Sequence, residues 1–123
     1  MLLVKSYLSP SKISGAGNGL FVKEPVKAGQ PVCDKRPGTY EIYTDEDAEN
    51  ASPSFRGFLD NFAYHVGDEW RLDKDNEKFI NHSRRPNLSP DGKALRDIGP
   101  DDELLYDYRQ IDDRIEQNPP SWL

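Results

Sequence analysis

Three short stretches of the chain combine residue types that could do chemistry, and the first is SGAGNGLFV. It alternates Gly15, Gly17 and Gly19 ahead of an apolar run. Because glycine lacks a Cβ atom, such a loop can take unusual backbone angles and let a ligand approach the main chain closely. The spacing differs from a G-x-G-x-x-G dinucleotide motif, and the apolar LFV predicts a strand where that motif needs a helix. A tight turn explains the glycines alone equally well.

The second stretch, KFINHSRRPN, contains one of the two histidines of the chain. Phe79 and Ile80 are expected to end a buried strand, and Asn81, His82 and Ser83 to form the turn that leaves it. Asn and Ser side chains commonly bond to nearby backbone groups, so a purely structural turn is a fair interpretation of this stretch alone.

The third stretch is DDELLYDYRQ, which reads as a strand. Alternation places Leu104, Tyr106 and Tyr108 on one face, with Leu105 and Asp107 on the other. Two tyrosines on one face usually pack in a core with their hydroxyl groups satisfied, so this stretch also has a structural interpretation.

The composition narrows the class of protein and of partner. The 123 residues suit one domain with its own core, and the formal net charge of −6 disfavours direct binding to nucleic acid. Basic proteins or peptides are the expected partners. The single cysteine, Cys33, excludes an internal disulfide and a multi-cysteine zinc site, and we expect no metal.

The apolar runs also bear on location. The N-terminal MLLVKSYLSP is too short for a signal sequence, and no segment approaches the roughly 20 apolar residues of a membrane span. We expect a soluble intracellular protein, in the cytoplasm or, in a eukaryotic host, the nucleus, with no membrane partner.

Many short apolar runs bounded by Gly, Pro, Asn or Asp predict a mainly β structure. One helix is expected in SPSFRGFLDNF, where Ser52 can cap the helix and Pro53 can occupy its first turn. A second is expected in YRQIDDRIEQN, which stops before two prolines. The acidic run TDEDAEN is interpreted as a solvated loop.

The order and combination of the three stretches resemble the SET-domain protein lysine methyltransferases. That family has a G-x-G loop followed by an apolar pair, an F-I-N-H-S-x-x-P-N stretch, and a G-x-E-L-x-x-D-Y stretch. The resemblance runs from about Ser11 to Tyr108. It implies a β-clip fold of small curved sheets with short helices and a C-terminal pseudoknot-like core. We expect a single SET domain over 1–123, with a motif core at about 11–108 and a C-terminal helix or tail over 109–123.

The resemblance also implies a cofactor, S-adenosylmethionine, and residues that hold it. The backbone of Ala16, Gly17 and Asn18 would approach its methionine part, and Asn81 would bind its amino end. The backbone of His82 would hold the adenine, so that His82 is neither a metal ligand nor a general base.

Tyr108 matches the catalytic tyrosine of the family, with its phenol oxygen beside the transferred methyl group and the lysine nitrogen. Methyl transfer mainly requires alignment of a neutral amine, and such positioning can contribute roughly 7–11 kcal/mol. Tyr106 resembles a Phe/Tyr switch whose hydroxyl leaves less room for added methyl groups, which predicts mainly monomethylation. Tyr64 and Tyr106 are the candidates for an aromatic lysine channel.

Many family members close this channel with a cysteine-rich segment after D-Y, but this chain has no cysteine there. Trp122, or the helix bearing Ile111 and Ile115, could close the pocket instead, and so could the partner in a homodimer. The segment between the first two motifs, roughly Thr39 to Tyr64, is short and acidic, and it suits a Lys/Arg-rich substrate such as a histone tail.

Two other functions remain open at this stage. One is a catalytically silent SET or β-clip module that binds basic peptides, because fold does not fix function. The other is an interaction protein that recruits basic partners through its acidic surface, although this leaves the three motifs unexplained.

Overall fold

The computed structural model describes residues 1–117. It begins with a hairpin of β1 (Ser6–Pro10) and β2 (Asn18–Val22), which pair antiparallel. The turn contains Gly15 and Gly17 at φ 79° and 73°, a region that favours glycine. A hydrogen bond of 2.8 Å from the Ser11 amide to the Gly17 carbonyl closes the turn.

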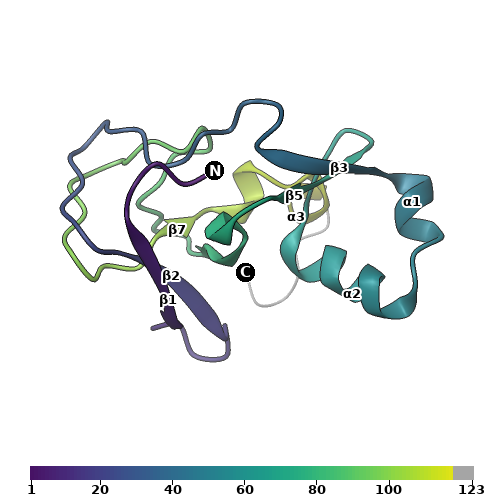
Figure 1. Ribbon diagram of the computed structural model, residues 1–123, viewed down its shortest axis with the longest axis horizontal. Coiled ribbons are helices and arrows are strands. Elements are labelled where there is room, and N and C mark those ends of the chain that lie inside the picture. The colour runs from purple at the N-terminus through teal and green to yellow at the C-terminus, as the bar shows by residue number, and fades with distance from the viewer. Residues whose placement is uncertain (118–123) are drawn as a thin grey trace.

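A second sheet has three antiparallel strands, with β5 (Glu69–Asp73) between β3 (Tyr40–Thr44) and β4 (Tyr64–Val66). Two helices connect β3 to β4, namely α1 (Asp45–Glu49) and α2 (Pro53–Phe62). Figure 1 shows this sheet and both helices together at one end of the molecule. The long loops that follow β2 and β6 lie at the opposite end.

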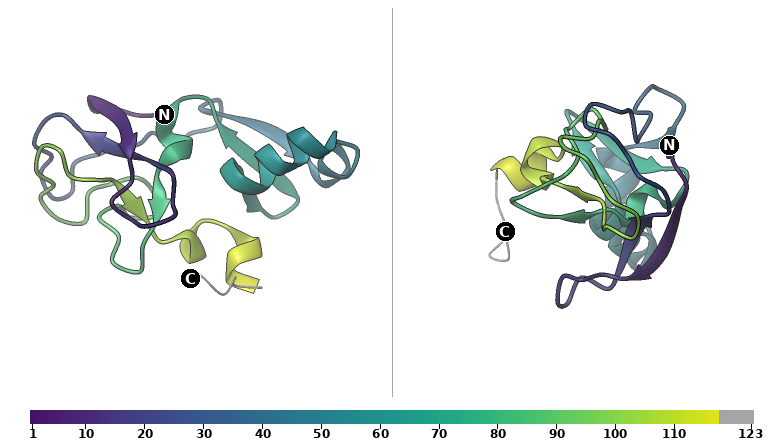
Figure 2. Two further views of the ribbon diagram at one scale, coloured as in Figure 1. Left: turned by 90° about the horizontal axis from the view of Figure 1, so that it is seen from below. Right: turned by 90° about the vertical axis from the view of Figure 1, so that its left-hand side faces the viewer.

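The third sheet joins distant parts of the chain, because β6 (Asn81–His82) pairs parallel with β7 (Leu105–Tyr106). A 3-10 helix, η1 (Asn76–Phe79), precedes β6, while η2 (Tyr108–Gln110) and α3 (Asp113–Gln117) follow β7. The Asn87 side chain fixes the loop after β6 to the last strand: it donates to the Glu103 carbonyl and accepts from the Leu105 amide, both at 2.8 Å. Figure 2 shows η2 and α3 below the rest of the fold.

Two apolar clusters form the core, one at each end of the molecule. The larger cluster packs β2 and β7 against the long loops and buries Leu20, Val22, Val26, Val32, Cys33, Ile80, Leu88, Ala94, Ile98, Leu104 and Tyr106. The smaller cluster packs α1 and α2 on the three-stranded sheet and buries Ala48, Leu59, Ala63, Trp70 and Leu72. The predicted mainly β architecture with short helices is confirmed. No helix in the described part is long and apolar enough to cross a bilayer.

Helix α2 begins where the sequence predicts. Ser52 is its N-cap, with the hydroxyl accepting from the Phe55 amide at 3.2 Å, and Pro53 opens the first turn. Leu59 is fully buried, so the apolar side of the helix faces the smaller cluster.

The acidic stretch TDEDAEN contains helix α1, so the prediction of a loop was wrong. Thr44 and Asp47 form a reciprocal capping box: each side chain accepts from the other residue's amide, at 3.0 and 2.9 Å. Three acidic residues in the first turn also favour a helix N-terminus, and Ala48 anchors the helix by burial.

The second and third motifs also differ from their predicted elements. Phe79 ends a 3-10 helix and not a strand, because Asp75 caps that helix by accepting from the Glu77 amide at 3.0 Å. Asn81–His82, predicted as a turn, is strand β6. The strand around Tyr106 stops before Tyr108, because Asp107 accepts from the Arg109 amide at 3.0 Å and turns the chain into η2.

The single C-terminal helix predicted from YRQIDDRIEQN is two short helices, η2 and α3. Ile111, at φ −124°, separates them. The Asp112 carboxylate then accepts from the Arg114 amide at 2.9 Å as the chain enters α3.

Candidate functional site

One large cavity, with a volume of about 630 Å³, lies between the β1–β2 hairpin, the end of α2, the β6–β7 pair and the C-terminal helices. This volume is typical of small-molecule sites, which span about 300–1,000 Å³. The predicted site residues that line the cavity are Ala16, Tyr64, Asn81, His82, Tyr106 and Tyr108. The fold therefore brings all three sequence motifs to one site.

Gly17 and Asn18 do not line the cavity, although they adjoin Ala16, which does. The Gly17 carbonyl closes the hairpin turn by accepting from Ser11. The Asn18 carbonyl accepts from the side-chain amide of Asn81 at 2.9 Å, which fixes the glycine loop to β6. These two residues hold the loop in place beside the cavity.

Glu103, which sequence reasoning missed, organises the same wall. Its Oε2 atom accepts from the Ser11 hydroxyl at 2.7 Å and from the Asn81 side chain at 3.2 Å. Its Oε1 atom accepts from the Lys12 amide at 3.0 Å. A Cβ atom at Gly19 would lie 2.4 Å from Oε2, so the third glycine of the motif is needed for this close approach.

Within residues 1–117, hydrogen bonds to Ile80 and His82 hold Tyr108 at the cavity. Its hydroxyl donates to the Ile80 carbonyl at 2.6 Å, and its backbone N–H donates to the Nδ1 atom of His82 at 3.0 Å. Burial raises the pKa of the Tyr108 phenol well above its ordinary value. The phenol is therefore protonated at neutral pH and fixed in direction.

His82 acts as a hydrogen-bond acceptor, which requires that Nδ1 carry no proton. Burial lowers the pKa of the imidazole, although the nearby Asp107 carboxylate opposes this shift. A neutral His82 packs at 5.3 Å, between ring centroids, against Tyr108. The side chain thus positions Tyr108.

At the other side of the cavity, Tyr64 and Tyr106 surround the ammonium group of Lys35, which sequence reasoning also missed. Lys35 Nζ lies 5.3 Å from the Tyr64 ring centroid and 4.7 Å from that of Tyr106. It pairs with Glu77 Oε1 at 3.1 Å. Cys33 is buried in the same cluster, and burial raises the pKa of its thiol well above the ordinary value. The two predicted channel tyrosines therefore lie side by side against a cation, the ammonium group of Lys35.

The C-terminal segment covers one wall of the cavity. Ile111 and Ile115, which the sequence offered as one way to close the pocket, both line the cavity. Asp112 and Arg114 line it as well. Trp122, the other candidate, lies outside the described residues.

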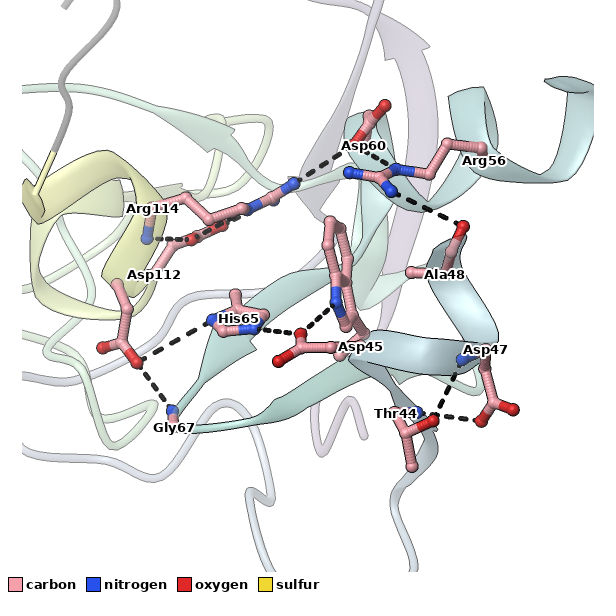
Figure 3. A network of polar contacts seen from close by, with 12 residues as sticks. Thr44, Asp45, Asp47, Ala48, Arg56, Asp60, His65, Gly67, Asp112 and Arg114 are labelled. Atoms are coloured by element: carbon pink, nitrogen blue, oxygen red, sulfur yellow. Dashed lines mark hydrogen bonds and ion pairs between the residues drawn. The ribbon is translucent and has the colours of Figure 1, made fainter. Parts of the chain in front are cut away.

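Arg114 fastens this segment to the three-stranded sheet (Figure 3). Its guanidinium group donates to the Ala63 carbonyl at 3.0 Å, pairs with Asp112 at 2.8 Å and lies 4.5 Å from the Trp70 ring centroid. Arg56 of α2 also stacks on Trp70, at 4.9 Å. The indole is thus shared by α2 and the C-terminal segment.

A second connection runs through Asp113 and His65. Asp113 accepts from the Gly67 amide at 2.6 Å, and His65 contacts Asp45 through Nε2 at 2.8 Å, as Figure 3 shows. Trp70 also donates to Asp45, at 2.9 Å. Helix α3, β4 and the start of α1 therefore form one polar network beside the cavity.

The described chain, 1–117, has no group of three His, Cys, Asp or Glu side chains arranged to hold a metal ion. The groups that line the cavity can therefore form hydrogen bonds through a fixed phenol, bind a cation through tyrosine rings, and exchange protons through carboxylates.

Comparison with known structures shows a shared fold. Chaetomium thermophilum Polycomb Repressive Complex 2 bound to GSK126 matches with a TM-score of 0.68 and 19% identity over 93% of this chain. The crystal structure of that complex matches with a TM-score of 0.63 and 19% identity over 85% of this chain. ctPRC2 in an autoinhibited conformation bound to S-adenosylmethionine matches with a TM-score of 0.66 and 18% identity over 95% of this chain.

This chain spans 17%, 15% and 17% of those three chains, respectively. A comparison with curated proteins finds no match. The model of the SET domain, however, matches residues 17–109, which include the glycine loop after Ala16, both later motifs and Tyr108. Because this match covers most of the chain and the fold agrees with it, the protein belongs to the SET-domain family.

Proposed function

We propose that this protein is an S-adenosylmethionine-dependent protein lysine methyltransferase. The observation that supports this most directly is the cavity itself. It joins the glycine loop at Ala16 and the pair Asn81–His82 to a half-buried Tyr108 phenol that is fixed by its hydrogen bond to Ile80. It also contains Tyr64 and Tyr106, whose rings both lie against the ammonium group of the chain's own Lys35.

The residues at the loop side fit the cofactor. Gly15 has φ 79°, and no atom lies within 4 Å of the place where a Cβ atom would stand, so the loop leaves room beside the cavity. The backbone near Ala16, with Asn81 and the backbone of His82, would hold the cofactor. When bound, S-adenosylmethionine supplies a methyl group on a sulfonium centre.

Tyr108 would orient the acceptor. Its hydroxyl hydrogen is directed to the Ile80 carbonyl, and its oxygen can accept a hydrogen bond from a lysine amine. The Ile80 carbonyl fixes the phenol hydroxyl, while His82 accepts from the Tyr108 backbone N–H and packs against its ring. Alignment of a nitrogen with a methyl carbon requires such rigidity.

Tyr106 would limit the product mainly to monomethyl-lysine. It is buried, and the Lys35 ammonium lies over its ring while Glu77 lies beside its hydroxyl. These groups leave little space in which a methylated nitrogen could turn, which supports a single transfer.

The substrate that fits best is a Lys/Arg-rich protein tail, such as a histone tail. Helix α1 exposes Asp45, Glu46 and Asp47 beside the three-stranded sheet, and the whole chain carries a net charge of −6. Complementary charge favours basic partners.

Mass spectrometry tests this proposal. Purified protein is incubated with S-adenosylmethionine and core histones or other basic proteins, beside Tyr108→Phe and a control, Tyr7→Phe, whose exposed hydroxyl bonds Asp101. We expect the wild type and Tyr7→Phe to add one methyl group to a lysine, and Tyr108→Phe to lose about 100-fold or more of this rate. Cofactor binding with no transfer to any protein would instead favour the silent binding module.

A further inference from the structure

Two buried carboxyl groups line the cavity close to the tyrosine rings, and neither belongs to a sequence motif. Asp73 ends strand β5 and Glu77 lies in η1, with only 5% and 2% of their surfaces exposed. Buried carboxylates are costly unless they are paired, so their partners indicate their roles.

Glu77 is a paired carboxylate. Its Oε1 atom lies 3.1 Å from Lys35 Nζ and 3.5 Å from the Tyr106 hydroxyl, and its Oε2 atom lies 3.2 Å from the amino group of Met1. Burial raises the pKa of Glu77, but the Lys35 ammonium, hydrogen bonds with Cys33 and Asp73 and the amino group of Met1 together outweigh burial, so the pKa is lowered. Glu77 therefore remains ionised and keeps Lys35 in place.

Asp73 differs from Glu77 because one of its oxygens is unsatisfied. Among residues 1–117, the buried Oδ1 atom has no hydrogen-bond partner. Burial raises the pKa of Asp73 to about 7; Lys35 opposes this shift, while the negative charge of Glu77 and a side-chain hydrogen bond with Glu77 add to it. The titratable and charged groups that face Asp73 are Lys35, Tyr64, Glu77, Tyr106 and the amino group of Met1.

We propose that Asp73 is the catalytic residue that binds the substrate lysine ammonium and takes its proton before methyl transfer. This inference rests on the proposed function. A buried, partly unsatisfied carboxyl group on the cavity wall, beside rings that surround an ammonium group, is suited to that contact. Glu77, whose charge is already balanced by Lys35, is not.

The step balances as follows. A proton passes from the substrate ammonium to the Asp73 carboxylate, which leaves the amine neutral with its lone pair available. The nitrogen then forms a bond to the methyl carbon as the carbon–sulfur bond breaks, and that electron pair leaves with sulfur. Asp73 afterwards releases its proton to solvent through the cavity. The fixed Lys35 ammonium assists, because a second positive charge beside it is disfavoured.

The pH dependence of methyl transfer tests this role with Asp73→Asn and a matched control, Asp68→Asn, in the exposed β4–β5 turn. For the wild type and the control, we expect kcat to rise with pH and level off above about pH 7. Asp73→Asn should lose about 100-fold at neutral pH and recover progressively toward about pH 10, as the lysine loses its proton to solution. An equal loss at every pH would indicate a structural role and overturn the proposal.

A second measurement needs neither cofactor nor turnover. Carboxyl ¹³C NMR follows Asp73 in the full chain while n-butylammonium, an analogue of the lysine side chain, is added. We expect a saturable shift at Asp73, and an affinity about tenfold or more lower in Asp73→Asn but unchanged in Asp68→Asn. No shift of the Asp73 signal in the wild type overturns the proposal, and this result does not depend on the stability of any variant. Equal affinity of Asp73→Asn and the wild type for n-butylammonium also overturns it.

The two hypotheses can fail separately. Methyl transfer with no special role of Asp73 would leave the proposed function intact and overturn this inference. A normal response to n-butylammonium without transfer to any protein would contradict the proposed function and still support the contact between Asp73 and an alkylammonium group.

Discussion

The hydroxyl of Tyr106 lies 3.5 Å from Glu77, which is long for a hydrogen bond, so its main effect is to occupy space. We expect Tyr106→Phe to shift the product from monomethyl-lysine toward di- and trimethyl-lysine, and to change the free energy of unfolding by less than about 1 kcal/mol. Peptide mass spectrometry measures the product distribution. Tyr40→Phe is the control, because Tyr40 packs against Tyr64 without lining the cavity. Exclusively monomethyl product from Tyr106→Phe would contradict the assigned role.

Asp73 gives the protein a pH-dependent stability. Its pKa is about 7 in the folded protein, mainly because of burial, against an ordinary value of 3.8. The folded state therefore holds a proton that the unfolded state has lost, and this stabilisation, complete below the ordinary pKa, disappears as pH rises to about 7. We expect Asp73→Asn to be more thermally stable than the wild type at pH 8, with a smaller difference at pH 5. Melting curves at both values test this, and a constant difference would contradict it.

The sequence motifs predicted the wall that contains Asn81, His82 and Tyr108, because those residues lie in short stretches with a known pattern. The cluster of Lys35, Asp73 and Glu77 could not be predicted in this way. Its members come from the loop before β3, the end of β5 and η1, and only tertiary packing brings them together. The contact between Gly19 and Glu103 was hidden for the same reason.

At the scale of elements, two glycines have opposite roles. Gly19 in β2 admits the Glu103 carboxylate, so Gly19→Ala should cost about 1–3 kcal/mol of folding free energy and loosen the Asn81 wall. Gly57 lies within α2 with nothing within 4 Å of an added Cβ atom, so Gly57→Ala should stabilise by about 1 kcal/mol. Urea unfolding of both variants tests the pair. If Gly19→Ala changed stability in the same way as Gly57→Ala, the Glu103 side chain would have to move away from the new Cβ atom at no cost.

Elements were predicted well where local signals and tertiary packing agree. Ser52 and Pro53 specify the start of α2, and the apolar LFV of the first motif forms most of β2. The acidic helix α1 was missed because its charge was given more weight than its capping box at Thr44 and Asp47. Strand β6 was missed because its polar pair, Asn81–His82, becomes a strand only by pairing with β7, more than twenty residues later.

At the scale of the whole molecule, Arg114 connects the C-terminal segment to the three-stranded sheet. We expect Arg114→Ala to weaken cofactor binding about tenfold or more, because it removes a hydrogen bond to Ala63 and the stacking on Trp70. Amide hydrogen exchange should also become faster over 108–117.

The matched control is Arg56→Ala, which removes the other guanidinium group stacked on Trp70 but leaves α3 attached. We expect exchange in α3 to stay slow in this control. Similar exchange and affinity in Arg114→Ala and the wild type would show that the C-terminal wall is held by other contacts.

Cys33 also offers a chemical reporter of the cavity. It is the only cysteine of the chain, it is buried, and the pKa of its thiol is raised by burial, with the Glu77 charge adding to the effect. Alkylating reagents attack the thiolate, so iodoacetamide should label the native protein only while this cluster is open. The labelling rate therefore measures how often the walls around Lys35 and Tyr106 separate. A ligand that fills the cavity should slow that rate without any engineered probe.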